Sequence, residues 1–311
     1  MPWIKLGRIH CLEASPTRAT LHMQVPTPLL TDSTIRIYFA ARNALGKSYP
    51  AYLDVRRDNP LAVLRVDDTP VMAHGPIGTF DEDGAMPGCA LRLGPRIHLY
   101  YSGWNQRKSI PYHNTTGLAI SRDGGEFFCR MFDGPILDRT SFEPYMAVTP
   151  WVVKEEALWR MWYVSGLSWT LVDERYEPVY GIKYAESTDG VQWKRPGVLV
   201  IPRKHDREAC AHPSVILQAG VYHMWFCYRD TVDFRDGKGS YRIGYASSPD
   251  GFTWKRQDHL SGIDVSRDGW DSTMLCYPSV LECDGRLLLF YNGNSFGQSG
   301  IGCAVWEGPL P

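Results

Sequence analysis

The sequence predicts an all-β protein: a single-domain β-propeller of five blades, each a four-stranded antiparallel sheet. Three observations predict it. A segment recurs five times along the chain, Asp-Gly turns lie at matching places inside the repeats, and no convincing amphipathic helix is found. The chain has 311 residues, of which 44% are hydrophobic and 13% aromatic, so it can form a full core and is not disordered.

Each repeat opens with a proline inside an apolar run, turns briefly, and continues into a run rich in aromatic residues. The prolines are 61, 63, 63 and 65 residues apart, and a large apolar residue follows each one after twelve positions. Because five units share this spacing, the repeat predicts the architecture of the whole chain. The prolines and then the large residues are Pro26, Pro87, Pro150, Pro213 and Pro278, and Tyr38, Leu99, Trp162, Trp225 and Phe290.

A third and a fourth strand follow in most repeats. Asp-Gly pairs at Asp123, Asp189 and Asp250 lie between alternating apolar runs, as tight hairpin turns require. Each repeat is therefore expected to be a four-stranded sheet, and such sheets repeated around an axis make a propeller. The expected blades span residues 20–70, 80–138, 143–200, 205–262, and 270–311 together with 1–10.

The fifth repeat lacks an outer strand of its own, because the chain ends at Pro311 soon after the run 300–306. The segment 3–9 reads WIKLGRI and is similar to the outer-strand segment that begins at Trp193. We expect it to fill the vacant place and close the ring, since an open last blade would leave strand edges unpaired.

Charge and composition argue against several kinds of partner. The 33 Lys and Arg against 34 Asp and Glu give a net charge of −1, which disfavours nucleic acid. No run of eighteen apolar residues is present, so no membrane span is expected. The oligomeric state is left open.

The cysteines and the first residues of the chain bear on its location. The start of the chain has no hydrophobic segment typical of a secretory signal. Eight cysteines are scattered without zinc-ligand spacing. We therefore expect free thiols, a cytoplasmic location, and neither a metal nor another cofactor, although the sequence alone leaves disulfides open.

We expect the functional site at the end of the propeller that carries the longer loops. The turns between first and second strands are short, and the Asp-Gly turns lie at that same end. Long loops on a rigid scaffold commonly carry binding groups. The loops after the second strands are expected at residues 43–50, 104–116, 167–180, 229–241 and 292–299.

Three carboxylates in the segments that lead into the innermost strands are candidate catalytic groups: Asp83, Glu143 and Glu208. Paired carboxylates perform glycoside hydrolysis, one protonating the leaving oxygen and the other acting as base or nucleophile. Structural alternatives stay open for each of them. Residues 81–83 would also suit a solvated loop or, more weakly, a cation site; Glu143 would suit a blade junction; and Glu208 would suit a polar pair with His212.

Candidate substrate-binding residues combine aromatic rings, amides and cations. Aromatic faces pack on the C–H surface of a sugar ring, while acids and amides bind its hydroxyls. Arg229 would present a fork of donors to a carboxylate, a phosphate or a hydroxyl, or else pair with Asp230. The expected set is His22, Arg42, Trp104, Asn105, Trp169, His212, Arg229, Asp271 and Asn294.

This arrangement resembles the superfamily of arabinanases, invertases and levansucrases, which includes glycoside hydrolase families 43, 32, 68 and 117. The resemblance covers almost the whole chain and includes the run WYVSG at 162–166. It implies a five-bladed propeller and a glycosidase-like enzyme that cleaves or transfers a glycosidic bond in a small saccharide or an oligosaccharide by acid/base chemistry.

One departure from those families concerns the residues before the prolines. The families typically carry an acid there in the first three blades, whereas this chain has Val25, Met86 and Thr149, followed by His212 and Tyr277 in the last two. Two alternatives therefore stay open: an enzyme acting on a sugar nucleotide or a lipid-linked sugar in polysaccharide biosynthesis, and a non-catalytic sugar-binding propeller.

Overall fold

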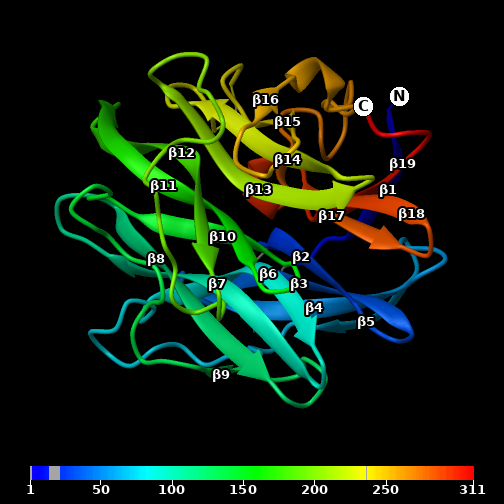
Figure 1. Ribbon diagram of the computed structural model, residues 1–311, viewed down its shortest axis with the longest axis horizontal. Coiled ribbons are helices and arrows are strands. Elements are labelled where there is room, and N and C mark those ends of the chain that lie inside the picture. The colour runs from blue at the N-terminus through cyan, green and yellow to red at the C-terminus, as the bar shows by residue number, and fades with distance from the viewer. Residues whose placement is uncertain (1, 14–21, 236) are drawn as a thin grey trace.

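The computed structural model describes residues 2–13, 22–235 and 237–311, and antiparallel β-strands make up most of it (Figure 1). The all-β prediction is confirmed.

The first group of strands is β2 (Gln24–Leu30), β3 (Thr34–Arg42), β4 (Ser48–Arg56) and β5 (Val63–Asp67). The second group is β6 (Gly84–Leu93), β7 (Arg96–Gln106), β8 (Tyr112–Ser121) and β9 (Cys129–Arg130). A single parallel pair, Ser48 with Gly84, joins these two groups into one sheet.

The third group has three strands instead of the four expected. Two isolated bridges, Lys183 with Leu199 and Glu186 with Lys194, stand where its fourth strand was expected. Its strands are β10 (Ala147–Lys154), β11 (Trp159–Val172) and β12 (Arg175–Ser187). The fourth group is β13 (Glu208–Gln218), β14 (Val221–Asp230), β15 (Arg242–Ser248) and β16 (Lys255–Arg256). Two short 3-10 helices are η1 (Asp258–Leu260) and η2 (Ser295–Gly297).

The last group joins the two ends of the chain. It contains β17 (Cys276–Cys283), β18 (Arg286–Asn292), β19 (Ile301–Trp306) and β1 (Trp3–His10). Strand β1 pairs antiparallel with β19 and sets Trp3 opposite Trp306. The ring of Trp3 also packs edge-on against Trp225, at 5.4 Å between centroids. The prediction that the N-terminal segment supplies the outer strand of the last group is confirmed.

The first strand of each group lies innermost. Strands β2, β6, β10, β13 and β17 contact one another in that order, and β17 contacts β2 again. Figure 1 shows these strands near the middle of the molecule, with the later strands of each group outside them. The large apolar residues of the repeat are all fully buried, as expected of core positions. They are Tyr38, Leu99, Trp162, Trp225 and Phe290.

Two segments expected as loops are largely strand. Strands β11 and β12 stay paired as far as Val172 and Arg175, so most of 167–180 is a long hairpin. Its two turn residues, Asp173 and Glu174, have φ of 46° and 64°, which fits the central positions of a type I′ turn. Likewise β7 and β8 pair through most of 104–116, and only residues 107–111 connect them.

Four of the five innermost strands lose their pairing register at the residue before the repeated proline. These four residues have positive φ: 60° at Val25, 45° at Thr149, 50° at His212 and 55° at Tyr277. The ladders shift at the same places. Residues with a branched β-carbon rarely adopt this conformation, and each such residue costs about 1–3 kcal/mol.

Side chains from a neighbouring group hold two of these strained positions. The amide of Val25 donates to Asn292 Oδ1 at 2.9 Å, and the amide of Thr149 donates to Ser102 Oγ at 2.9 Å. Asn292 lies on β18 of the last group, and Ser102 lies on β7 of the second. Contacts between groups therefore keep buried N–H groups bonded where the strand ladder is interrupted.

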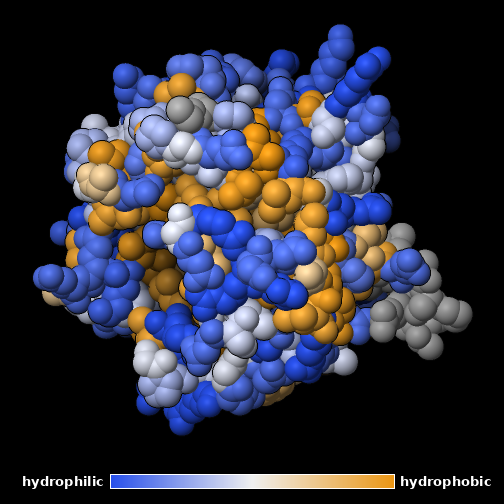
Figure 2. Space-filling model, turned by 90° about the vertical axis from the view of Figure 1, so that its right-hand side faces the viewer, coloured by the Kyte–Doolittle hydropathy of each residue, from blue (hydrophilic) through white to orange (hydrophobic). Residues whose placement is uncertain are grey.

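One face of the molecule carries an apolar hollow. Figure 2 shows apolar side chains gathered around this hollow, with hydrophilic side chains around them. All eight cysteines are free thiols, and six of them are buried. Within the described ranges, no helix is long and apolar enough to cross a membrane.

The strain at Thr149 predicts an inverted order of stability for two variants. Thr149→Gly should have a free energy of unfolding about 1 kcal/mol higher than Thr149→Ala, because only glycine adopts positive φ without cost. Urea unfolding followed by tryptophan fluorescence measures both. The matched pair Thr170→Gly and Thr170→Ala, on β11 without a positive φ, should show the ordinary order with alanine more stable. An alanine variant at 149 as stable as the glycine variant would contradict the predicted strain.

Candidate functional site

A pocket of about 410 Å³ lies where the innermost strands begin, and we call it the central pocket. All five innermost strands contribute residues to it, so it lies among them. Its volume is in the range typical of small-molecule sites. The lining residues are Gln24, Val25, Arg42, Met86, Trp104, Gln106, Pro111, Tyr112, Asn114, Met146, Val148, Thr149, Val164, Arg175, Tyr180, Ala211, Tyr241 and Tyr277.

Aromatic side chains form much of the lining. Trp104 is held in place because its indole Nε1 donates to Ser48 Oγ at 2.7 Å. Tyr180 and Tyr241 touch through their hydroxyl groups. Burial raises the pKa of Tyr241 and of Tyr277 well above the usual 10, so both phenols stay protonated at neutral pH and can donate hydrogen bonds. Such rings offer both flat apolar faces and hydroxyl donors.

Two polar atoms in the lining have no partner within the part of the chain that the structure describes. They are Asn114 Oδ1 and Thr149 Oγ1, and both are shielded from solvent. Buried polar atoms in folded proteins almost always have a hydrogen-bond partner, so these two indicate positions for the hydroxyls of a ligand or for water.

Positive charge dominates the pocket. Arg42 and Arg175 line it, and among its described lining residues there is no aspartate or glutamate. Arg42 comes from the end of β3 and Arg175 from the start of β12, so two different groups of strands each supply one guanidinium.

Glu143 is buried and paired with cations, and it does not line the central pocket. Its carboxylate accepts from Arg195 at 2.8 Å, Lys183 at 3.3 Å and the Tyr163 hydroxyl at 2.8 Å. Its own exposed fraction is 2%. The surroundings of the Glu143 carboxylate are therefore set by residues 20 to 52 positions further along the chain.

Glu208 and Asp83 are also paired, and neither lines the central pocket. Glu208 accepts two hydrogen bonds from Arg256, at 2.7 and 2.8 Å, and a third from the amide of Lys204. Asp83 pairs with Lys47 at 3.1 Å and accepts from the amide of Gln106 at 2.9 Å. Of the three acids, Asp83 is the one that contacts a lining residue. The catalytic roles of Asp83, Glu143 and Glu208 stay a prediction.

The acids of the leading segments follow a repeated arrangement, which we call the carboxylate anchor. In each anchor a buried carboxylate pairs with a cationic side chain from the outermost segment of its own group. In three anchors the carboxylate also accepts a hydrogen bond from the hydroxyl of a tyrosine twenty residues later in the chain. An anchor therefore fixes the segment before an innermost strand to the outer edge of the same sheet. The pairs are Asp81 with Arg130, Glu143 with Arg195, Glu208 with Arg256, and Asp271 with Lys5.

The expected binding residues divide into three sets. Arg42 and Trp104 line the central pocket. His212, Trp169 and Arg229 contact its lining tyrosines instead of lining it themselves. The remaining four do not line the pocket and are bonded elsewhere. His22 contacts Gln298, and Asn105 donates a hydrogen bond to the Thr79 carbonyl. Asp271 belongs to an anchor, and Asn294 accepts hydrogen bonds from the amides of Thr273 and Met274.

His212 is a neutral side chain behind the lining. It is 2% exposed, and burial lowers its pKa to about 3. Its Nε2 lies 3.3 Å from Ser279 Oγ, while its Nδ1 has no partner among the described residues. His212 therefore does not form the pair with Glu208 that was one alternative for these residues.

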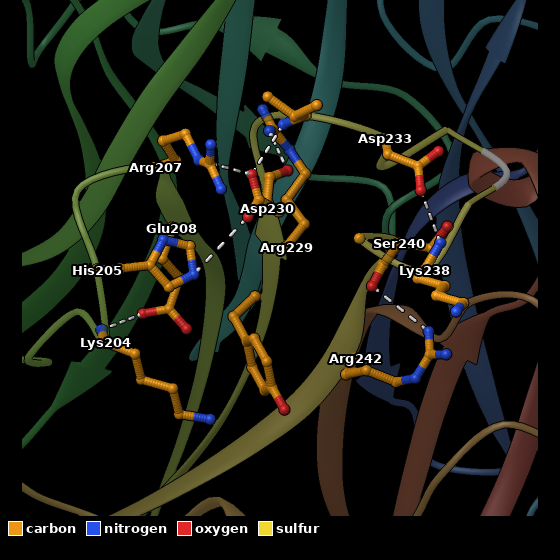
Figure 3. A pocket seen from close by; sticks show the side chains of 13 residues that line it. Lys204, His205, Arg207, Glu208, Arg229, Asp230, Asp233, Lys238, Ser240 and Arg242 are labelled. Carbon is orange, nitrogen blue, oxygen red and sulfur yellow. Dashed lines mark hydrogen bonds and ion pairs between the residues drawn. The ribbon is translucent and has the colours of Figure 1, made fainter.

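Arg229 lies between the central pocket and a second cavity of about 570 Å³, shown in Figure 3. Its Nε donates to the hydroxyls of Tyr180 and Tyr241, and its terminal nitrogens donate to backbone carbonyls of Asp230 and Pro178. The expected pairing with the Asp230 side chain is not present. In Figure 3 that carboxylate instead faces His205 and Arg207, at 3.8 and 3.6 Å.

Several lining residues were not predicted. Tyr112 and Arg175 lie on strands where loops were expected, so the assumed end of each strand hid them. Thr149 and Tyr277 precede the repeated prolines, and this position was a usable signal. Other lining residues were not singled out by the repeat, although several lie within the expected loops 104–116, 167–180 and 229–241: Gln106, Asn114, Tyr180 and Tyr241.

Comparison with solved structures places the fold. No model of a known protein family matches the chain. A glycoside hydrolase matches with a TM-score of 0.73 and 18% identity, covering 99% of this chain and 93% of that protein. A thermostable family-43 glycoside hydrolase matches at 0.69 and 17%, covering 96% and 97%. An exo-1,5-α-L-arabinanase from a bovine ruminal metagenomic library matches at 0.63 and 13%, covering 94% of each.

The chain therefore has the fold of the glycosidase superfamily that its sequence resembles. Two relatives from strains of Mycobacterium tuberculosis, the uncharacterized proteins MT1551 and Rv1502, are each 36% identical over 309 residues. The match covers 99% of this chain and the full length of each relative. The chain belongs to the same protein family as these two mycobacterial proteins.

The anchor at Glu143 predicts a loss of stability when its charge is removed. Glu143→Gln should lower the free energy of unfolding by about 3 kcal/mol, because Arg195 and Lys183 lose a buried counter-charge. Urea unfolding measures this, with Glu156→Gln as the control because Glu156 is exposed on the adjacent turn. A Glu143→Gln protein of unchanged stability would contradict the structural role of the anchor. If that protein also lost turnover, the result would support a catalytic role for Glu143.

Proposed function

We propose that this protein is a carbohydrate-active protein of the glycoside hydrolase type and that its saccharide site is the central pocket. The observation that carries the proposal is the lining of that pocket: aromatic rings beside an amide and a hydroxyl group whose oxygens have no partner among the described residues. Sugar rings stack on aromatic faces and need many short hydrogen bonds, and this lining offers both. The fold shared with glycoside hydrolases supports the same proposal.

The architecture behind this site is, in our proposal, a closed ring of five blades in one domain. The cyclic contacts among β2, β6, β10, β13 and β17 support a ring, and the pairing of β1 with β19 supports its closure. The blade boundaries stay as predicted from the repeat; their residues 1, 20, 21 and 236 lie outside the described residues.

Of the three candidate acids, we assign the acid/base role in bond cleavage at this pocket to Asp83. Its carboxylate accepts from the amide of Gln106, a lining residue, and its side chain retains 16% exposure. Glu143 and Glu208 are each 2% exposed and each hydrogen-bonded to an arginine, which supports a role in holding the sheets. Acid/base chemistry at the pocket therefore rests on Asp83 in this proposal.

A second candidate is a non-catalytic sugar-binding protein. The observation that favours it is the composition of the pocket, whose described lining residues include no carboxylate. Glycoside hydrolysis ordinarily uses two carboxylates at most about 9.5 Å apart across the scissile bond. Binding without turnover on every bound saccharide would decide for this candidate.

The cytoplasmic location stays a prediction. Eight free thiols, six of them buried, agree with a reducing compartment, because disulfides form mainly in oxidising ones.

Trp104 provides the test of the site. Trp104→Ala should weaken saccharide binding by about tenfold or more, because one stacking face is lost. Saturation-transfer NMR against a panel of mono- and disaccharides, followed by calorimetry, measures binding. Phe142→Ala is the matched control, because Phe142 is 86% exposed and does not line the pocket. Unchanged affinity in Trp104→Ala would place the site elsewhere.

Asp83 separates the two candidates. Chromatography of the products from each bound saccharide measures turnover, and Asp83→Asn should abolish it while binding persists. A saccharide that binds without being turned over by the unaltered protein would instead assign the non-catalytic function.

A further inference from the structure

We propose that the saccharide bound in the central pocket carries a negative charge, either the carboxylate of a uronate or the phosphate of a sugar phosphate. This inference rests on the proposed function of the pocket and adds the chemical class of its ligand. It is drawn from three arginines at the pocket, their partners, and the lack of acids among the described lining residues.

Arg42 has no carboxylate partner among the described residues, and two of its donors are free. Its Nε and one N–H of Nη2 donate to Gln24 Oε1 at 3.3 and 3.2 Å, and one N–H of Nη1 donates to the Gly46 carbonyl at 2.9 Å. A guanidinium has five N–H groups, so one remains on each terminal nitrogen. These two donors are available to the oxygens of a carboxylate or a phosphate.

The surroundings of Arg42 do not neutralise its charge. Burial lowers the pKa of Arg42 itself, as is expected of a cation without a counter-ion. Burial and the charge of Arg42 lower the pKa of His22 to about 4, so this neighbour is neutral at pH 7. The ring of Trp104 lies 5.7 Å from the guanidinium, and its face attracts the cation without cancelling its charge.

Arg175 adds positive charge from the opposite group of strands. It pairs with Glu177 at 3.4 Å, but Arg235 pairs with the same carboxylate at 2.5 Å. Two guanidiniums sharing one carboxylate leave a net charge of +1. The Arg175 side chain is 55% exposed, so it can move toward a ligand at the mouth of the pocket.

Arg229 supplies a buried positive charge behind the tyrosines. It is 3% exposed and has no carboxylate partner in the described ranges. Its Nε donates to Tyr180 and Tyr241, which line the pocket. The two phenols also hydrogen-bond each other, which uses one of their two protons. The pair therefore keeps one proton for donation and transmits the positive potential of Arg229 to the pocket.

These groups together make the pocket a site of positive potential in a partly buried place. The phenols of Tyr241 and Tyr277 stay neutral, because burial raises their pKa, and so they do not balance the arginines. Charge interactions are stronger away from bulk water, so an anionic group on the sugar gains more here than at an open surface. The chemistry of the lining thus selects an acidic sugar over its neutral counterpart.

The test compares matched sugars on the same protein. Galactose, galacturonate and galactose 1-phosphate are titrated at low salt, and calorimetry or saturation-transfer NMR measures each affinity. The acidic sugars should bind about tenfold or more tightly than galactose, and Arg42→Gln should remove most of that preference. Arg175→Gln, at an exposed residue, tests the same preference if Arg42→Gln does not fold. Arg96→Gln should leave it unchanged, because Arg96 is exposed at the opposite end of the second group.

The outcomes separate this inference from the proposed function. Equal binding of galactose and galacturonate would overturn the inference and leave the saccharide site standing. Binding of inorganic phosphate as tight as that of galactose 1-phosphate, with no binding of galactose or galacturonate, would overturn the saccharide site instead. A preference for one acidic sugar that both arginine variants lose supports the inference and identifies the anion as carboxylate or phosphate.

Discussion

The structure depends on one repeated constraint: an innermost strand that breaks its register at a residue before proline. Proline cannot donate to the ladder, and the positive φ before it turns the chain where a regular strand would run straight on. Side chains of a neighbouring group hold the break at Val25 and Thr149. Val25, Thr149 and Tyr277 line the central pocket, so three of the four breaks with positive φ belong to the candidate site. Strain of this kind is found at functional sites, where the surrounding structure maintains it.

The carboxylate anchors complement these breaks. Each one ties the segment before an innermost strand to the outer edge of its own sheet, so the start of the strand cannot slide. A buried ion pair contributes little net stability, since both ions lose their hydration, but removing one partner is costly. The anchors therefore act mainly to specify one arrangement of the segments that surround the pocket. The pocket itself keeps cations and phenols, and its described lining residues include no carboxylate.

Much of the fold could be predicted from the sequence, and less of the site. The proline spacing and the buried large residues identified the repeat, and the similarity of 3–9 to an outer strand identified the partner of β19. Among the predicted binding residues, Arg42 and Trp104 line the central pocket, and their role in binding stays a prediction. The surroundings of Glu143 and Glu208 could not be predicted, because Arg195 and Arg256 return to them from 52 and 48 positions further along. Tyr112 and Arg175 were missed because strand ends follow pairing and turn geometry, which the repeat does not encode.

The most direct measurement of the central claim is NMR of methionine methyl groups during titration with a saccharide. Met86 and Met146 line the central pocket, whereas Met131 lies on the surface with 42% exposure and is not part of the lining. Binding in the pocket predicts that the methyl signals of Met86 and Met146 shift together in a saturable way while that of Met131 does not move. Saturable binding that leaves both pocket methionines unshifted would contradict the account.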